Sequence, residues 1–238
     1  MRNGLLHATI LSLALAGVTA CGDDVTDPEA FAESAEAEAI MLSARDLPVL
    51  PELLDRAAPD SDTDRALAIR ARELWAAGTL ASDPRGAARR QLAIGYALPV
   101  LVGSVPGEDW AAAASRMADW MTTVDGLMDR VAVPEVRARL RVARRYLDRA
   151  DAVEVDPRRR ARYLLLAMSE LVETTPRYVA RHLVADAATA LAAGPELDDR
   201  RLDRAVRLKD WAERAVEEGD YLLAIQRAYY AIQLAEGR

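Results

Sequence analysis

The stretch DPRRRARYLLLAMSELVETTP, residues 156–176, decides the expected fold. Asp156 can cap a helix through its side chain, and Pro157 suits the first helical position, where a missing N–H costs nothing. Good helix formers follow, and the pair Thr175-Pro176 then repeats the cap-then-proline pattern. We therefore predict one helix that opens at Pro157 and a second that opens at Pro176.

Similar start and stop signals recur along the chain, and no segment alternates apolar and polar residues between turns as a strand would. We predict an all-α fold of about eight helices. Pro99 should kink the second helix or end it early, because proline removes a backbone hydrogen bond. Short connections favour tandem antiparallel hairpins, four in all, in a repeat array or a bundle. The expected ranges are 61 or 62–81, 84–102, 107–132, 134–153, 157–174, 176–194, 198 or 199–218 and 220–237.

Two features suggest that the hairpins are repeats. Asp83-Pro84-Arg85 aligns with Asp156-Pro157-Arg158 when the chain is shifted by 73 residues, and such self-similarity is typical of repeat arrays. The last expected hairpin, WAERAVEEGDYLLAIQRAYYAI at 211–232, resembles a tetratricopeptide repeat. The small, turn and packing positions of that motif are occupied by Ala212, Gly219, Tyr221, Ala224, Ala231 and Ile232.

This resemblance implies stacked helix pairs with a concave surface that binds a peptide or another protein. The candidate groove residues are Tyr221, Tyr229 and Tyr230. Adjacent tyrosines on a helix point about 100° apart, so one can pack inward while the other faces solvent. The alternative is that both belong to the core. The four tryptophans fall at apolar helical spacing and are expected in the core: Trp75, Trp110, Trp120 and Trp211.

The N-terminal residues have the layout of an export signal. A short cationic head, Met1-Arg2-Asn3, precedes an apolar run over 4–18 that is too short to span a bilayer comfortably. The run ends in Val18-Thr19-Ala20-Cys21, which resembles the lipobox of bacterial lipoproteins that are cleaved by signal peptidase II. The resemblance implies cleavage between Ala20 and Cys21 and attachment of a diacylglyceryl group to the Cys21 thiol.

Lipidation would also account for a lone thiol. Cys21 is the only cysteine, and an unpaired thiol is a liability in an oxidising compartment unless a modification consumes it. Two or three acyl chains anchor a protein stably, whereas one does so only marginally. We expect a protein anchored in the cell envelope, and at the outer membrane rather than the inner, because Gly22 stands where an aspartate would mark inner-membrane retention.

The charged residues are distributed unevenly along the chain, which has a net charge of −7. In the segment 22–65 acidic residues far outnumber arginines, which favours a solvated tether. The expected organisation is a signal peptide over 1–20, an acidic and partly flexible tether over 21–61, and a single helical domain over 62–238. Part of the tether, 29–44, can equally be an acidic first helix, and both alternatives stay open.

Ten arginines lie in the segment 137–162. Guanidinium groups bind phosphates and carboxylates, so this segment is a candidate site for an anion or an acidic partner. The alternative is a solvated, internally salt-bridged face, because the chain uses arginine almost throughout and Lys209 is its only lysine. The candidate residues are Arg141, Arg144, Arg145, Arg158, Arg159 and Arg162.

Catalytic motifs are scarce. His182 is the only histidine after the signal segment, which excludes zinc sites built from several His and Cys ligands. No glycine-rich phosphate loop or nucleophile elbow occurs, and Glu170 with Glu173 is interpreted as a solvated face. Arg177 and His182 form an Arg-x-x-x-x-His pattern that, with AYYA at 228–231, is similar to HEPN ribonucleases, although the two motifs stand in the opposite order. We expect His182 to pair with Asp186 instead.

These observations predict a membrane-anchored envelope lipoprotein with a helical binding or assembly module for another envelope protein. The alternative is a binder of an anionic small ligand, lipid or cell-wall polymer through the arginine-rich helices, and a further alternative is a HEPN-like nuclease. We expect no enzymatic activity, no cofactor, no metal and no nucleic-acid partner. A protein-binding module should have a groove of mixed aromatic and polar groups, whereas an anion binder should bring its arginines together at one pocket.

Overall fold

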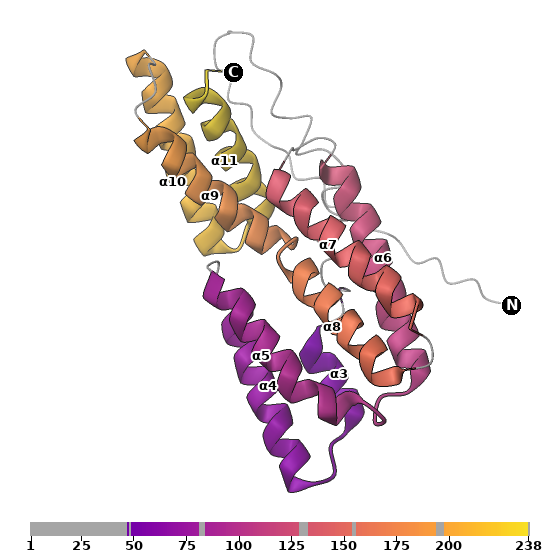
Figure 1. Ribbon diagram of the computed structural model, residues 1–238. Helices are drawn as coiled ribbons and strands as arrows, with labels where there is room; N and C mark the ends of the chain where they lie inside the picture. The colour runs from indigo at the N-terminus through magenta and orange to yellow at the C-terminus, as the bar shows by residue number, and fades with distance from the viewer. Residues whose placement is uncertain are drawn as a thin grey trace, which may run out of the picture.

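Every regular element in the described part of the chain is an α-helix (Figure 1). The computed structural model describes residue 47 and residues 49–80, 84–128, 133–153, 156–193 and 198–237. This confirms the all-α fold of helical hairpins. The signal peptide, Cys21 and the segment 29–44 lie outside the described residues. The helices are α3 (Leu50–Ala57), α4 (Asp62–Leu80), α5 (Pro84–Leu101), α6 (Gly107–Met128), α7 (Pro134–Asp151), α8 (Pro157–Val172), α9 (Pro176–Ala192), α10 (Asp199–Glu218) and α11 (Tyr221–Ala235).

Local signals account for most helix ends. Proline opens α5, α7, α8 and α9, as the sequence predicts. Asp156 and Asp198 each accept a hydrogen bond from a backbone N–H three residues on, at 3.0 and 2.9 Å. Gly219 ends α10 with φ at +83°, a conformation that glycine adopts without strain. The second predicted helix continues through Pro99 only as far as Leu101.

Three neighbouring pairs of helices pack as hairpins: α4 with α5, α7 with α8, and α10 with α11. The Asp-Pro pairs that align in the sequence open α5 and α8, the second helix of the first two hairpins. The predicted pairing of α8 with α9 is wrong. Helix α9 packs instead on α11 and α10, while α8 packs on α7, α5 and α6 (Figure 1).

The link between α8 and α9 explains this difference. A left-handed residue after a helix often turns the chain back sharply, as Gly219 does between α10 and α11. Glu173 has φ −78° and ψ 1°, and Thr175 has φ −69° and ψ 150°, so neither residue adopts that conformation. The chain therefore runs on from α8 into α9 and carries the last three helices away from the first hairpins, as Figure 1 shows.

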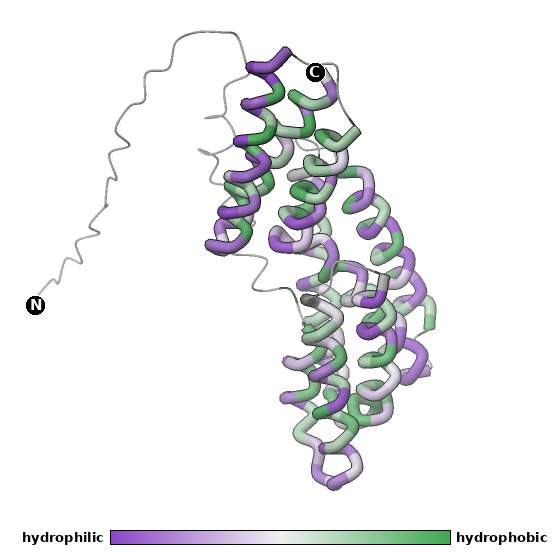
Figure 2. The backbone as a smooth tube through the Cα atoms, turned by 90° about the vertical axis from the view of Figure 1, so that its left-hand side faces the viewer, coloured by the Kyte–Doolittle hydropathy of each residue, from purple (hydrophilic) through white to green (hydrophobic). Residues whose placement is uncertain are grey.

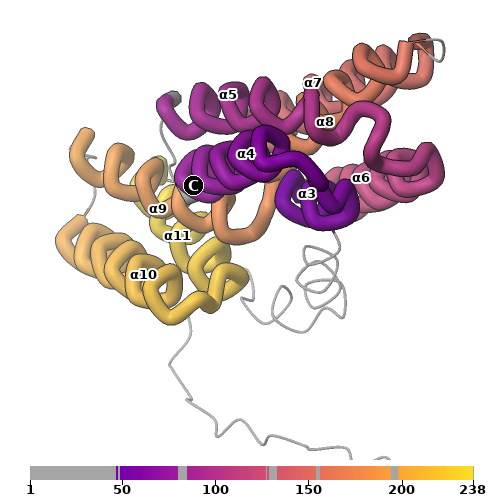
Figure 3. Tube along the Cα trace, turned by 90° about the horizontal axis from the view of Figure 1, so that it is seen from below, coloured from indigo at the N-terminus to yellow at the C-terminus, as the bar shows by residue number. Residues whose placement is uncertain are grey.

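Helix α3 lies in the range that the sequence analysis assigned to the tether, 21–61. Its residues Leu50, Leu53 and Leu54 are at most 1 % exposed, and the helix contacts α4 and α5. Two ion pairs join α3 to α6: Arg116 with Glu52 at 3.0 Å, and Arg56 with Asp109. Seen from below, α3 sits beside α4 and next to α6 (Figure 3). The helical body therefore includes α3 and does not begin at residue 62.

Buried apolar residues form one cluster that extends from Leu47 in the N-terminal part to Ala228 in α11. Figure 2 shows apolar and polar residues alternating around most helices, as expected when each helix buries one face. Trp75, Trp110 and Trp120 belong to the core as predicted. Trp211 does not, because its side chain is 42 % exposed and lies under the guanidinium of Arg227 at 5.6 Å.

The hairpin of α4 and α5 is closely packed at Gly78. A Cβ atom on this residue would lie 2.7 Å from Cγ of Arg90 and 2.8 Å from the carbonyl oxygen of Gly86. Only glycine allows the two backbones to approach this closely without a shift. Among the described helices, none has both the length and the apolar content needed to cross a membrane.

Candidate functional site

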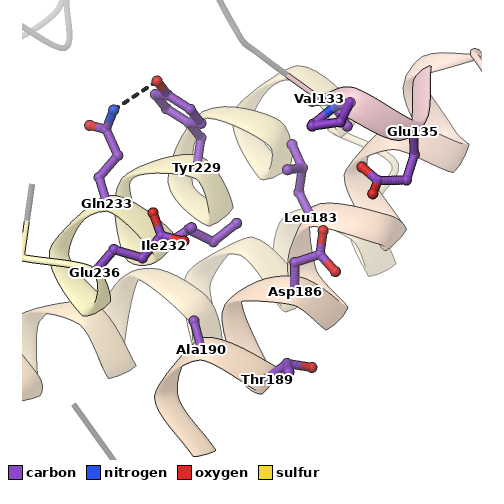
Figure 4. A pocket seen from close by; sticks show the side chains of 11 residues that line it. Val133, Glu135, Leu183, Asp186, Thr189, Ala190, Tyr229, Ile232, Gln233 and Glu236 are labelled. Carbon is purple, nitrogen blue, oxygen red and sulfur yellow. Dashed lines mark hydrogen bonds between the residues drawn. The ribbon is translucent and has the colours of Figure 1, made fainter. Parts of the chain in front are cut away.

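A pocket with a volume of about 520 Å³ lies where the start of α7 meets α9 and α11 (Figure 4). Helix spacing places each set of lining residues on one face, since residues three, four and seven apart share a side of a helix. The pocket thus combines residues from three helices that are distant in sequence. It is lined by Val133, Pro134 and Glu135 before and in α7, by Leu183, Asp186, Thr189 and Ala190 of α9, and by Tyr229, Ile232, Gln233 and Glu236 of α11 and its C-terminal cap.

Carboxylates give the pocket its charge. Glu135, Asp186 and Glu236 line it, and none of the lining residues is basic. The side chains of Glu135 and Asp186 are 57 % and 46 % exposed, so both can meet a ligand. A group of negative charges in a concave site raises the local concentration of cations.

His182 lies next to two of these carboxylates, those of Asp186 and Glu135. Its Nε2 atom is 3.3 Å from Oδ2 of Asp186 and 3.6 Å from Oε2 of Glu135. The first distance brings His182 into contact with Asp186, as predicted, although the two do not form a hydrogen bond. The Nε2 atom is buried and has no hydrogen-bond partner despite these distances. Its ring stacks on that of Tyr178, one turn earlier in α9, with the centroids 6.5 Å apart.

The walls of the pocket are apolar and aromatic. Val133 and Leu183 are 1 % and 4 % exposed, and Ile232 packs partly buried against the core. Nε2 of Gln233 donates a hydrogen bond of 2.7 Å to the hydroxyl of Tyr229, shown as the dashed line in Figure 4. Apolar walls with a few fixed polar groups are the usual composition of a ligand pocket.

The structure separates the three tyrosines that the sequence analysis grouped as a groove. Tyr229 lines the pocket, whereas Tyr221 and Tyr230 are not among its lining residues. Tyr221 is partly buried against the core. Tyr230 contacts Tyr229 edge to face, with ring centroids 6.0 Å apart. Aromatic pairs of this geometry stabilise each other, so Tyr230 supports the residue that faces the pocket.

The candidate arginines lie elsewhere. All six, Arg141, Arg144, Arg145, Arg158, Arg159 and Arg162, are exposed on the α7 and α8 hairpin, and none of them lines the pocket. Arg144 pairs with Asp125 of α6 at 3.1 Å. Elsewhere in the arginine-rich segment, Arg139 pairs with Glu170 at 2.9 Å and with Glu173 at 2.7 Å. These pairs support the alternative of a solvated, internally salt-bridged face.

A buried polar cluster joins α5 to α8 and was not anticipated. Arg90 is 2 % exposed and donates to the carboxylate of Glu173, to the hydroxyl of Ser169 at 3.1 Å and to the carbonyl of Gly78 at 2.8 Å. Burial, which removes water from the guanidinium, lowers the pKa of Arg90. The interpretation of Glu173 as part of a solvated face is therefore wrong, since its side chain is 4 % exposed.

Nearby, Nε1 of Trp120 donates to Oγ1 of Thr174 at 2.8 Å, and Thr174 in turn donates to the carbonyl of Leu171 at 2.7 Å. This chain of hydrogen bonds joins α6 to the link between α8 and α9. Buried polar groups of this kind must be paired, because an unpaired one costs about 1–3 kcal/mol. The Arg90 cluster and this chain are enclosed, so we assign them to packing rather than to ligand binding.

In the described residues no three His, Cys, Asp or Glu side chains gather closely enough to hold a metal ion. Comparison of the chain with protein-family models, with curated proteins and with solved structures found no match.

Proposed function

We propose that this chain is a lipid-anchored protein of the bacterial cell envelope whose helical body binds another envelope protein. The anchor is argued from Val18-Thr19-Ala20-Cys21 and from the absence of a second cysteine in the sequence. The binding role depends on one structural observation, the pocket formed by α7, α9 and α11. It offers an aromatic side chain, apolar walls and several carboxylates within one concave site.

This composition supports protein binding over the arginine-based alternative. Binding sites for protein segments combine an aromatic or apolar anchor position with a polar rim, and Tyr229 and Ile232 with Gln233 fit that pattern. An anion-binding site would need several of the arginines at one pocket, yet this pocket contains none. The arginine-rich hairpin stays a separate candidate surface for acidic groups.

Site-specific crosslinking in cells tests the proposal. A photo-crosslinking amino acid replaces Gln233 in the lipidated protein, and the matched control carries it at Glu108, an exposed position in the first turn of α6. We expect crosslinks to a single envelope protein from position 233 and not from position 108. Equal crosslinking from both positions, or none from either, would contradict a binding role for the pocket.

The anchor is tested separately. Intact mass spectrometry of the protein from membranes should show loss of residues 1–20 and the added mass of acyl chains at Cys21. Cys21→Ser should abolish both changes, because serine has no thiol to be modified. An unmodified Cys21 in the processed protein would contradict the lipid anchor. The crosslinking result would then still test the binding role of the pocket.

A further inference from the structure

We infer that the pocket of α7, α9 and α11 binds a basic side chain of the partner, lysine or arginine, with its charged head between Glu135 and Asp186 and its aliphatic stem against Leu183 and Ile232. This inference rests on the proposed function, because it specifies the chemistry of the protein segment that the pocket receives.

The first argument is charge. Glu135 and Asp186 bring negative charge to the pocket, and no basic residue is among its lining residues. Oε2 of Glu135 and Oδ2 of Asp186 lie 3.6 and 3.3 Å from Nε2 of His182, so these two oxygens, one from α7 and one from α9, are at most 6.9 Å apart, the sum of the two distances. An ammonium or guanidinium at the mouth of the pocket can therefore interact with both carboxylates at once.

The second argument comes from the helix ends. The last turn of α9 contributes Thr189 and Ala190, and the last turn of α11 contributes Ile232 and Gln233. The carbonyl groups at a helix C-terminus carry partial negative charge that a cation stabilises. Neither helix has a basic residue in its own last turn. The ends of α9 and α11 therefore add to the negative potential at the pocket, which the N-terminal turn of α7 partly opposes.

The third argument is shape and polarity. A volume of about 520 Å³ accommodates a long side chain together with part of its backbone. Lysine and arginine bury their methylene stems along apolar surface while the charged head meets polar groups. Leu183, Ile232 and Val133 supply the apolar surface, and the carboxylates supply the polar end. A purely apolar side chain would instead take water away from Glu135 and Asp186 without offering them a positive charge, which costs free energy.

The negative charge of the pocket also disfavours two other possible ligands. The chain's own segment 22–46 has eight acidic residues and a single arginine, so the pocket would repel it. Phosphate groups and acidic lipid head groups carry the same sign as the pocket. A basic segment of a partner protein is therefore the occupant that the charges favour.

Peptide binding to the full chain, purified in a non-ionic detergent, tests the inference. The probe is a fluorescein-labelled, amidated hexapeptide of alternating leucine and lysine, followed by fluorescence anisotropy at low salt. The comparison peptides replace each lysine with acetyl-lysine or with glutamate. The variants Glu135→Gln, Asp186→Asn and their combination remove charge and keep shape. Asp151→Asn, at the exposed far end of α7, is the matched control.

The lysine peptide should bind, and the acetylated and glutamate peptides should bind at least about tenfold more weakly. Each pocket variant should weaken binding by about three- to fivefold and the combination by about tenfold, since partly exposed ion pairs contribute modestly. Asp151→Asn should change the affinity by less than about twofold. Salt should weaken binding of the lysine peptide to the unaltered chain.

The inference would be overturned if the glutamate peptide bound as tightly as the lysine peptide, or if the combined variant bound the lysine peptide as tightly as the unaltered chain. It would also be overturned if the lysine peptide did not bind. The two proposals fail separately. Crosslinks from position 233 without lysine-peptide binding would leave the protein-binding role intact and make the assigned chemistry wrong. Lysine-peptide binding without crosslinks would support the pocket chemistry and contradict the role in assembly.

Discussion

The substitution Glu173→Gln should destabilise the helical body strongly, although it changes one carboxylate oxygen into an amide group. Glu173 and Arg90 have side chains that are 4 % and 2 % exposed, so neither charge is screened by water. Removal of one partner from a buried pair usually costs 3–5 kcal/mol, because the remaining charge is left buried without compensation. The lower end of this range applies here, since Tyr178 and then Glu170 also raise the pKa of Arg90 and offset part of the loss.

We therefore expect a loss of about 3 kcal/mol, which for a urea slope of about 3 kcal/mol per molar shifts the midpoint by about 1 M. Urea unfolding followed by circular dichroism measures both quantities. The matched control is Glu170→Gln in the last turn of α8, three residues before Glu173. Its partner Arg139 is 39 % exposed, so the expected loss is about 1 kcal/mol or less.

A double substitution separates charge from packing. Arg90→Met combined with Glu173→Met removes both buried charges, and similar exchanges in buried pairs are often neutral or stabilising. We expect this double variant to be more stable than Glu173→Gln alone. If Glu173→Gln stays within about 1 kcal/mol of the unaltered protein at an unchanged slope, the argument that the buried pair joins α5 to α8 is refuted.

The remaining predictions concern backbone and cap positions. Gly78→Ala should destabilise the protein by about 1–3 kcal/mol, because the new Cβ atom would overlap Arg90 and the backbone of Gly86. Gly95→Ala in α5 should instead stabilise the protein by about 0.5–1 kcal/mol, because its Cβ atom would enter open space and alanine favours the helix. Urea midpoints that fall in the opposite order would contradict the close approach of α4 and α5. Asp220→Ala removes the hydrogen bond that the Asp220 carboxylate accepts from the N–H of Leu223, and it should lower the free energy of unfolding by about 1 kcal/mol. The measurement is the melting temperature, and an unchanged value would mean that this cap does not stabilise the protein.

Sequence patterns predicted the helix ends well because the signals act within one or two turns. The cap residues, the prolines at first helical positions and the glycine with positive φ each constrain only nearby backbone. Helix α3 was missed for the same reason. It is short, it contains Pro51 and acidic residues, and its leucines become core residues only through contact with α4 and α5.

The pocket depends on contacts between helices that short sequence patterns do not predict. The sequence analysis singled out Tyr229 and the pairing of His182 with Asp186, and both belong to the pocket or border it. It did not connect them with Glu135, which comes from α7 and meets α9 only in the folded protein. Grouping Tyr221 with Tyr229 followed from their closeness in sequence, which does not place two residues at one pocket.

The sequence by itself determined an all-α protein and most of its helix boundaries, because dihedral preferences and capping hydrogen bonds are local. Tertiary structure alone decided that α9 leaves α8 to pack on α11, that Glu173 is buried against Arg90, 83 residues away, and that three carboxylates share one pocket. These outcomes depend on the shapes and charges of side chains that meet only after the helices have packed, and no short segment contains both partners.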